Sequence, residues 1–217
     1  MTRSLSLDIE TIADPSKVDQ LPPVEAAKNL KDPAKVQADI AEMQQAQRDK
    51  MGLDPTTNLI CSLATKDIDT GDETTFFLNQ YLSNEREILE NFWELAHQYD
   101  RFVTFNGMSF DVPVIRWHSM LHQVRPAVDI KCSKYKIENH VDIRMILANG
   151  DQYARGNQDY YCKLILGPDQ GKPAGIDGSM VQKFWDAGLY DEIREYNLDD
   201  VRKLAQLYQR LLGYYYF

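Results

Sequence analysis

Two acidic residues stand close together near the start of the sequence, in the stretch LSLDIET. Apolar and polar residues alternate there, which predicts a β-strand whose side chains point to opposite faces in turn. Asp8 and Glu10 therefore share one strand face. Acids that simply face water are common on a half-exposed strand. The alternative is a binding site for a hard divalent cation such as Mg²⁺ or Mn²⁺, which prefers carboxylate oxygens as ligands.

Two further patterns place acids at defined positions of predicted elements. The stretch FNGMSFD contains Asn106, Phe110 and Asp111 at a predicted strand-to-helix junction. The stretch YNLDD carries Tyr196 and Asp200 four residues apart on a predicted helix, so that both side chains share one helix face. Taken singly, an acid at a helix start is usually a cap or a dipole partner, and a Tyr–Asp pair is usually the polar edge of a helix.

In this order and with these spacings, the three patterns resemble the motifs of the DEDDy branch of the 3′–5′ exonucleases, which have an RNase H-like fold. The sequence is similar in particular to the proofreading exonuclease domain of family-B DNA polymerases and to its stand-alone relatives. The resemblance extends over residues 4–210. The family motifs DxE, NxxxFD and YxxxD are matched by Asp8 and Glu10, by Asn106, Phe110 and Asp111, and by Tyr196 and Asp200. Because 217 residues leave no room for a polymerase half, we expect a separate exonuclease.

The resemblance implies a site for two Mg²⁺ or Mn²⁺ ions. Two such ions roughly 4 Å apart activate the attacking water and stabilise the phosphate and the leaving oxygen. By resemblance, Asp8 would bridge both ions. Glu10 and Asp200 would hold the ion nearest the water, and Asp111 would help to hold the other. The hydroxyl of Tyr196 would orient the water, because a phenol with a pKa of about 10 is a better positioner than base.

Several residues are expected to contact the substrate. Thr11, Asn106 and Phe110 stand within the matched motifs. Lys172 lies in the Gly/Pro-rich stretch GPDQGKPAGIDG, where it either contacts a phosphate or occupies a surface turn. The densest basic stretch either contacts a single-stranded backbone and a base or forms a solvated loop; it comprises Arg125, Lys131, Lys134, Tyr135 and Lys136.

Two histidines have a spacing that can serve a metal ion. His118 and His122 are four residues apart on a predicted helix. The acid of an HExxH motif is missing between them, and the sequence shows no third ligand. We therefore expect both histidines on an exposed helix surface.

The composition is that of a globular protein, with 43% hydrophobic and 26% charged residues. No apolar run approaches the roughly 20 residues that span a bilayer, and no signal-peptide pattern precedes Asp8. We therefore expect a cytoplasmic protein that does not bind or span a membrane. Three cysteines without CxxC spacing argue against a disulfide framework and a thiolate zinc site. The net charge of −9 argues against broad electrostatic binding of nucleic acid, although bound cations can still attract a few phosphates.

The elements that must position these residues follow an α/β pattern. Strand-like stretches dominate the first half and helical ones the second, which predicts a mixed sheet of about five strands with helices on both faces. After the first strand, strands are predicted at residues 58–69, 73–80 and 101–105, with a weaker one in either 127–130 or 140–143. Helices are predicted over 33–51, 84–99 with Ser83 as N-cap, 111–124, 159–166, 178–188 and 190–212.

We expect one domain over residues 1–217, interrupted by a helical insertion at residues 13–57. Proline residues break the chain before a helix that has Asp32 as N-cap and Pro33 as its first residue. The apolar stripe of this helix is thin, which predicts that most of the helix is exposed.

The sequence thus predicts metal-dependent removal of nucleotides from the 3′ end of single-stranded DNA. The alternatives are an RNA 3′-exonuclease and a catalytically idle nucleic-acid-binding subunit on the same fold. A DNA polymerase or another replication or repair protein is the expected protein partner. Retention of all four acids and the tyrosine argues against the idle alternative, because a binding module gains nothing from crowded carboxylates.

Overall fold

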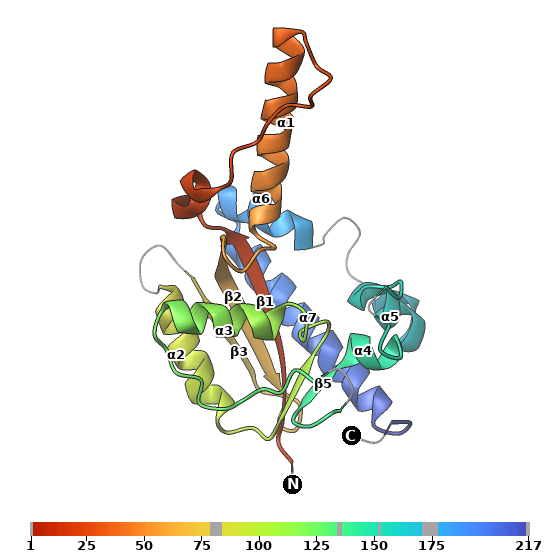
Figure 1. The fold of residues 1–217 in the computed structure, drawn as a ribbon. Helices are drawn as coiled ribbons and strands as arrows, with labels where there is room; N and C mark the ends of the chain where they lie inside the picture. Colours follow the sequence, from red (N-terminus) through yellow and green to blue (C-terminus); the bar gives the residue numbers. More distant parts are fainter. Residues whose placement is uncertain (1, 79–83, 134–135, 152, 171–177, 216–217) are drawn as a thin grey trace.

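A five-stranded mixed sheet forms the centre of the computed structural model, which describes residues 2–78, 84–133, 136–151, 153–170 and 178–215 (Figure 1). The strands are β1 (Ser4–Ala13), β2 (Asn58–Asp67), β3 (Glu73–Phe77), β4 (Arg101–Thr104) and β5 (His140–Asp142). They lie in the order β3-β2-β1-β4-β5. The pairs β1–β2 and β2–β3 are antiparallel, whereas β1–β4 and β4–β5 are parallel. The predicted α/β class with a mixed five-stranded sheet is confirmed, and the weaker strand is the one within 140–143.

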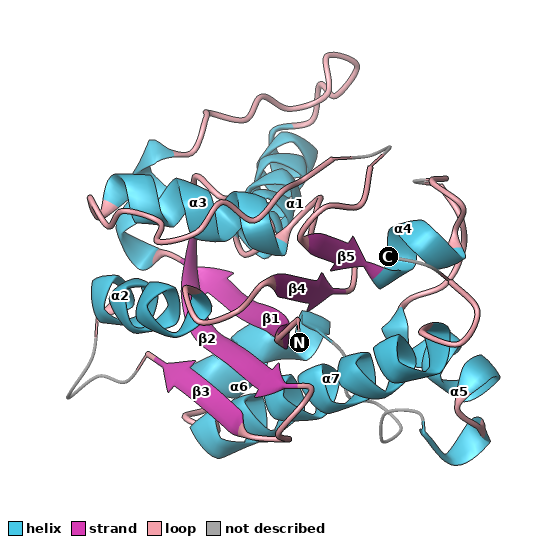
Figure 2. Cartoon of the chain, turned by 90° about the horizontal axis from the view of Figure 1, so that it is seen from below, coloured by secondary structure: helices cyan, strands magenta, loops and turns pink. Residues whose placement is uncertain are grey.

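Helices cover both faces of this sheet (Figure 2). On one face α2 (Glu85–Ala96) and α3 (Asp111–Leu121) pack on the apolar side of β1, which contributes Leu5, Leu7 and Ile9. On the other face α7 (Tyr190–Leu211) runs across β1, β2, β3 and β4. Around α7 lie α4 (Ile143–Leu147), α5 (Gln158–Ile165) and α6 (Val181–Asp186), with short 3-10 turns at Pro168–Gln170 and Gly178–Met180.

The polar face of β1 is covered and does not face open water. Ser6 is fully buried, and its Oγ donates to the carbonyl oxygen of Val201 on α7 at 3.1 Å. Glu10 is only 9% exposed. The interpretation of β1 as an ordinary half-exposed strand is therefore wrong, because α7 lies over the face that carries the two acids.

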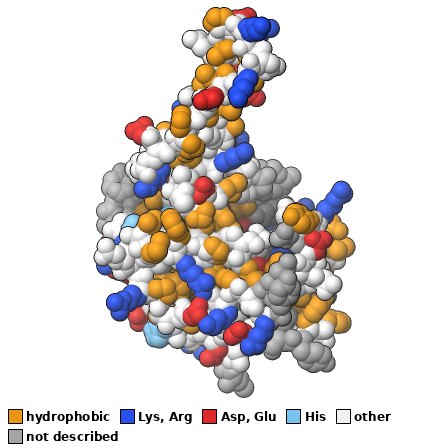
Figure 3. Space-filling model, in the orientation of Figure 1, with side chains coloured by type: hydrophobic (Ala, Val, Ile, Leu, Met, Phe, Trp, Pro, Cys, Tyr) orange, Lys and Arg blue, Asp and Glu red, His pale blue; other side chains and the backbone are white. Residues whose placement is uncertain are grey.

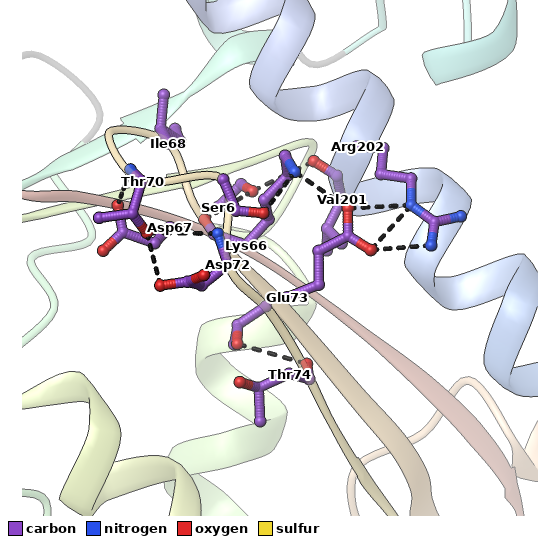
Figure 4. Close-up of polar contacts among 12 residues, drawn as sticks. Ser6, Lys66, Asp67, Ile68, Thr70, Asp72, Glu73, Thr74, Val201 and Arg202 are labelled. Carbon is purple, nitrogen blue, oxygen red and sulfur yellow. Dashed lines mark hydrogen bonds and ion pairs between the residues drawn. The ribbon is translucent and has the colours of Figure 1, made fainter.

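The helix α7 is fixed to the sheet at its middle (Figure 4). Arg202 reaches both carboxylate oxygens of Glu73 on β3, with Nε–Oε1 at 3.0 Å and Nη2–Oε2 at 2.8 Å. The contact between Ser6 and Val201 lies one residue earlier on the helix. These two contacts fix the position of α7 along its axis and its rotation about that axis, immediately after Asp200.

The chain between β1 and β2 projects from the body (Figures 1 and 3). It contains a 3-10 turn at Pro15–Gln20 and the helix α1 (Pro33–Met51). The side chain of Asp32 accepts from Ala34 N at 3.0 Å, which confirms the predicted N-cap. Among the residues of α1 only Met51, at its base, is buried, so the prediction of a largely exposed helix is confirmed.

The start of α2 differs from the prediction. The N-cap is Asn84, whose Oδ1 accepts from Glu87 N at 3.1 Å. Ser83, the expected cap, lies outside the described residues. Serine and asparagine are both good caps, so the sequence alone could not decide between neighbouring positions.

None of the helices in the described parts of the chain is both long enough and apolar enough to cross a membrane.

Candidate active site

Three carboxylates converge between β1 and α7. Asp8, Glu10 and Asp200 each offer an oxygen atom, and these atoms lie within 4.8 Å of one another. Asp8 and Glu10 reach the same place because they are two residues apart on one strand face. Beside them, Glu10 pairs with Ser62 whereas Thr11 pairs with Ile60, so Cys61 is the extra residue of a β-bulge in β2.

Asp8 is held in place by an amide of α7. The Nδ2 of Asn197 donates to Oδ2 of Asp8 at 2.7 Å, and the Oδ1 of Asn197 accepts from Oγ of Ser62 at 2.7 Å. Asn197 is fully buried. Sequence reasoning missed this residue, although an asparagine among the apolar positions of a buried helix face was a usable signal.

Asp200 is held from the opposite side by α5. It is 6% exposed, and Nε2 of Gln158 donates to its carbonyl oxygen at 2.8 Å and contacts its Oδ1 at 3.4 Å. Gln158 is the first residue of α5, which begins after the N-cap Asn157. Residues more than forty positions apart therefore meet at this carboxylate, and nothing local in the sequence indicated the contact.

Asp111 lies next to this cluster at the start of α3. It is 4% exposed, and its Oδ1 accepts from the backbone N–H of Ile9 at 3.1 Å. The strand β4 pairs with β1 only over residues 4–6, so Ile9 lies beyond the paired part and its N–H is available to a side chain. Asp111 is thus tied to the sheet, although its oxygens are not part of the group that lies within 4.8 Å.

The surroundings of Asp111 favour its protonated form. Burial raises the pKa of Asp111 to about 7, and the nearby charges of Asp142 and Asp200 add to this effect. The hydrogen bond from Ile9 acts in the opposite direction. A buried carboxyl group with such a pKa, next to other carboxylates, indicates a place where a cation would relieve repulsion.

The loop before α3 is shaped by Asp142 at the end of β5. Its two oxygens accept from the backbone N–H groups of Asn106 and Met108 at 2.9 and 3.0 Å. Asn106 has a φ of 65°. A Cβ on Gly107 would lie 2.4 Å from Oγ1 of Thr104, so only glycine fits there. Sequence reasoning also missed Asp142, which shapes this loop.

The residues predicted to contact the substrate each have a different environment in the structure. The Oδ1 of Asn106 accepts from Nη1 of Arg144 at 3.3 Å. Phe110 is half-buried and packs against the core under α2 and α3. The hydroxyl of Thr11 donates to the carbonyl oxygen of Gly52 at 2.6 Å and so ties β1 to the base of α1. Lys172 lies outside the described residues.

Tyr196 is half-buried on α7, one turn before Asp200. Its ring packs against the cluster formed by Ile12, Cys61, Phe77, Val181 and Ile193. Its hydroxyl lies 3.9 Å from the position that a Cβ on Gly178 would take. The spacing on α7 orients Tyr196 and Asp200 toward the same side of the helix.

The basic stretch after α3 is largely paired with acids in its described part. Lys131 forms an ion pair with Asp129, and Lys136 lies 3.6 Å from Glu138. Lys134 and Tyr135 lie outside the described residues.

The expectation of an exposed helix surface was wrong for His118 of α3, whereas His122, the C-cap of α3, is 35% exposed. His118 is 2% exposed and lies against Glu85 of α2, which also contacts His122. The partner escaped sequence reasoning because it stands more than thirty residues earlier in the chain.

The donor set of the acid cluster fits a hard divalent cation. Carboxylate oxygens are the ligands that Mg²⁺ and Mn²⁺ take in proteins. Three carboxylates at this separation, with a fourth next to them, repel one another unless positive charge is bound or protons are taken up.

A family model described as a predicted 3′–5′ exonuclease related to the exonuclease domain of PolB matches residues 57–214. The chain belongs to this family. The match includes the positions of Asn106, Asp111, Tyr196 and Asp200, whereas β1 with Asp8 and Glu10 lies before it. No curated protein matches the sequence.

A solved structure gives the fold independently. The family B DNA polymerase from the hyperthermophilic archaeon Pyrobaculum calidifontis matches 98% of this chain with a TM-score of 0.64 and 19% sequence identity. The chain spans 25% of the length of that polymerase. This member of the PolB-related family therefore has the same fold as the matched part of that polymerase.

Replacing Asp111 tests the electrostatic state of the site without any assay of activity. An unfolded Asp has a pKa of about 3.9, so between pH 4 and pH 7 the folded protein keeps a proton that the unfolded chain loses. Stability from this group therefore falls as the pH rises through this window. Asp111→Asn should stabilise chelator-treated protein at pH 8 by as much as about 4 kcal/mol and by little at pH 4.

Urea unfolding at both pH values measures this effect. Asp191→Asn, at an exposed acid in the first turn of α7, serves as the matched control and should change little at either pH. If Asp111→Asn changed the free energy of unfolding equally at pH 4 and pH 8, the surroundings would not raise the pKa of Asp111.

Proposed function

We propose that this protein is a metal-dependent 3′–5′ exonuclease that hydrolyses single-stranded DNA from its 3′ end by a two-metal-ion mechanism. The observation that carries the proposal is the convergence of Asp8, Glu10 and Asp200 within 4.8 Å, with Asp111 next to them. The family match and the polymerase-like fold support this chemistry. A nucleic acid is the substrate class that such a site serves.

Each side chain has a distinct task in this proposal. Asp8 lies two residues before Glu10 on β1, and its ligand atom lies within 4.8 Å of those of Glu10 and Asp200, so it would be shared by both ions. Glu10 and Asp200 would hold the ion near the attacking water, and Asp111 would contribute to the other. When bound, Mg²⁺ or Mn²⁺ would lower the pKa of the water and neutralise charge on the phosphate.

The surrounding residues would keep this geometry fixed. Asn197 holds one oxygen of Asp8, and Gln158 holds both the backbone and the side chain of Asp200. Preorganised ligands need no rearrangement when a substrate arrives, which is where positioning contributes to rate. The hydroxyl of Tyr196 would orient the water, one helical turn before Asp200.

We propose DNA as the substrate, and the proposal is supported by the family's relation to the exonuclease domain of PolB and by the fold shared with a family B DNA polymerase. An RNA 3′-exonuclease is the second candidate, and the same assay on RNA decides between them. We place the activity in the cytoplasm, with a DNA polymerase or another replication or repair protein as partner. Co-purification with a polymerase tests the partner separately from the chemistry.

Asp8→Ala should abolish turnover, because one carboxylate would serve both ions. The assay uses a 5′-labelled single-stranded oligonucleotide with Mg²⁺, with Mn²⁺ and with EDTA. The parent protein should shorten the strand stepwise from its 3′ end, lose activity in EDTA and fail on a strand with a blocked 3′ terminus. Asp191→Ala removes an exposed charge on α7 and is the matched control. Hydrolysis by Asp8→Ala at the parental rate, or release of the 5′ nucleotide first, would sink the assignment.

Tyr196→Phe separates the positioning of water from the binding of metal. The substitution keeps the ring and its packing and removes only the hydroxyl. Orienting or proton-transfer groups typically contribute about 10²–10⁴-fold, so the single-turnover rate should fall within that range. The Mn²⁺ titration and the affinity for the oligonucleotide should stay near those of the parent.

Two companion variants give this result its meaning. Asp200→Asn should weaken Mn²⁺ binding as well as the rate. Tyr190→Phe removes a hydroxyl from the same aromatic cluster on α7 and should leave the rate unchanged. Parental activity of Tyr196→Phe would make Tyr196 a packing residue only.

A further inference from the structure

We propose that Glu85, His118 and His122 form a second metal site that binds a transition-metal ion of the Zn²⁺ class. The site does not depend on the exonuclease proposal. It lies among α2 and α3, on the opposite face of the sheet from α7 and the acid cluster. Its three donor atoms, one from each residue, lie within 4.8 Å of one another.

Glu85 stands between the two histidines. It is the first residue of α2, and its side chain is 4% exposed. Its Oε1 lies 2.8 Å from Nδ1 of His118, and its Oε2 lies 2.7 Å from Nε2 of His122. The i,i+4 spacing on α3 brings both rings to the same side of the helix. The third ligand that the sequence lacked is thus supplied by another helix.

The tautomer of His118 is set by its second contact. Nδ2 of Asn58 donates to the carbonyl oxygen of Gly52 at 3.1 Å, so Oδ1 of Asn58 is the atom that faces Nε2 of His118, at 2.8 Å. An amide oxygen only accepts, and Nε2 therefore carries the hydrogen. A metal-binding histidine usually donates its other ring N–H to such an oxygen.

The remaining ring nitrogen of His118, Nδ1, faces Glu85 inside the cluster. Nδ1 is buried and makes no hydrogen bond to any described residue, although Oε1 of Glu85 is 2.8 Å away. Its contact with Glu85 thus lacks the geometry of a hydrogen bond. A cation bound between Nδ1 and Oε1 would take the place of a proton there and would satisfy both atoms.

Glu85 is fixed in the same way as a metal-binding carboxylate. Its Oε1 accepts from the backbone N–H of Ile60 at 2.7 Å. Such supporting contacts orient ligands before a metal binds. Through Ile60 and Asn58 the site is tied to β2, and through Asn58 it is also tied to Gly52 at the base of α1.

The chemistry of the donors selects the ion. Two imidazoles and one carboxylate form a zinc ligand set, whereas Mg²⁺ and Ca²⁺ take oxygen ligands. Bonds of about 2.0–2.1 Å to a tetrahedral Zn²⁺ separate neighbouring ligand atoms by about 3.3 Å. The separations of 2.8 and 2.7 Å from Glu85 must therefore widen on binding. The partly exposed side chain of His122 can shift outward, and the Glu85 carboxylate would have to shift slightly away from the buried His118. Water would take the fourth position.

The visible absorption of bound Co²⁺ distinguishes this site from the acid cluster. Chelator-treated protein is titrated with Co²⁺, which absorbs visible light strongly in a tetrahedral nitrogen-containing site and weakly in an octahedral carboxylate site. We expect one equivalent of strongly absorbing Co²⁺ that Zn²⁺ displaces. At about 100 times its Kd, Zn²⁺ should raise the Tm by about 5–10 °C.

Three variants locate the absorption. His122→Gln should weaken Co²⁺ binding by at least about 10–100-fold, because even supporting contacts are worth that much. His97→Gln changes an exposed histidine at the end of α2 and should bind Co²⁺ like the parent. Asp8→Ala should also keep the absorption, which separates this site from the acid cluster.

A second measurement covers the case in which His122→Gln fails to fold. X-ray absorption of the Zn²⁺-loaded parent protein should show two imidazole ligands among nitrogen and oxygen neighbours only. A parent protein without strongly absorbing Co²⁺, an unaltered titration in His122→Gln, or zinc without imidazole ligands would overturn the proposal. Glu85 and the histidines would then form a buried polar cluster only.

Discussion

Repulsion among crowded carboxylates that are wholly or partly buried is the constraint on which this structure depends. Asp8, Glu10 and Asp200 are brought within 4.8 Å by a strand and a helix that are nearly two hundred residues apart in sequence. Like charges at such distances do not stay together unless other contacts hold their backbones in place. The rest of the fold can be understood as the frame that supplies those contacts.

The frame acts from several directions at once. The contacts Ser6–Val201 and Glu73–Arg202 fix α7 directly after Asp200. Asn197 links Asp8 to β2 through Ser62. The short pairing of β4 with β1 leaves the N–H of Ile9 for Asp111. Asp8, Asp111 and Asp200 are therefore each held by an element other than the one that carries them.

Local patterns in the sequence were sufficient to predict much of this arrangement. The period of two placed Asp8 and Glu10 on one face of β1, and the spacing of four placed Tyr196 and Asp200 on one side of α7. Asp32 and Pro33 marked the start of α1. These features depend on backbone geometry over a few residues, and that geometry is nearly the same in every strand or helix.

The contacts that sequence reasoning missed are all long-range. Asn197 donates to Asp8, and Asp142 accepts from the backbone of Asn106. Glu85 contacts His118. Each of these contacts forms only when the chain has folded. Polar side chains of this kind look like surface residues until the helix or strand that covers them is known. The expectation that His118 lies on an exposed helix surface was wrong for this reason.

Anomalous diffraction from a crystal soaked in Mn²⁺ tests the central claim most directly, because it locates cations without relying on turnover. The account predicts two Mn²⁺ peaks roughly 4 Å apart among the carboxylates of Asp8, Glu10, Asp111 and Asp200, with Asp8 between the two ions. A soaked crystal in which these four side chains keep their places and no Mn²⁺ lies among them would contradict it.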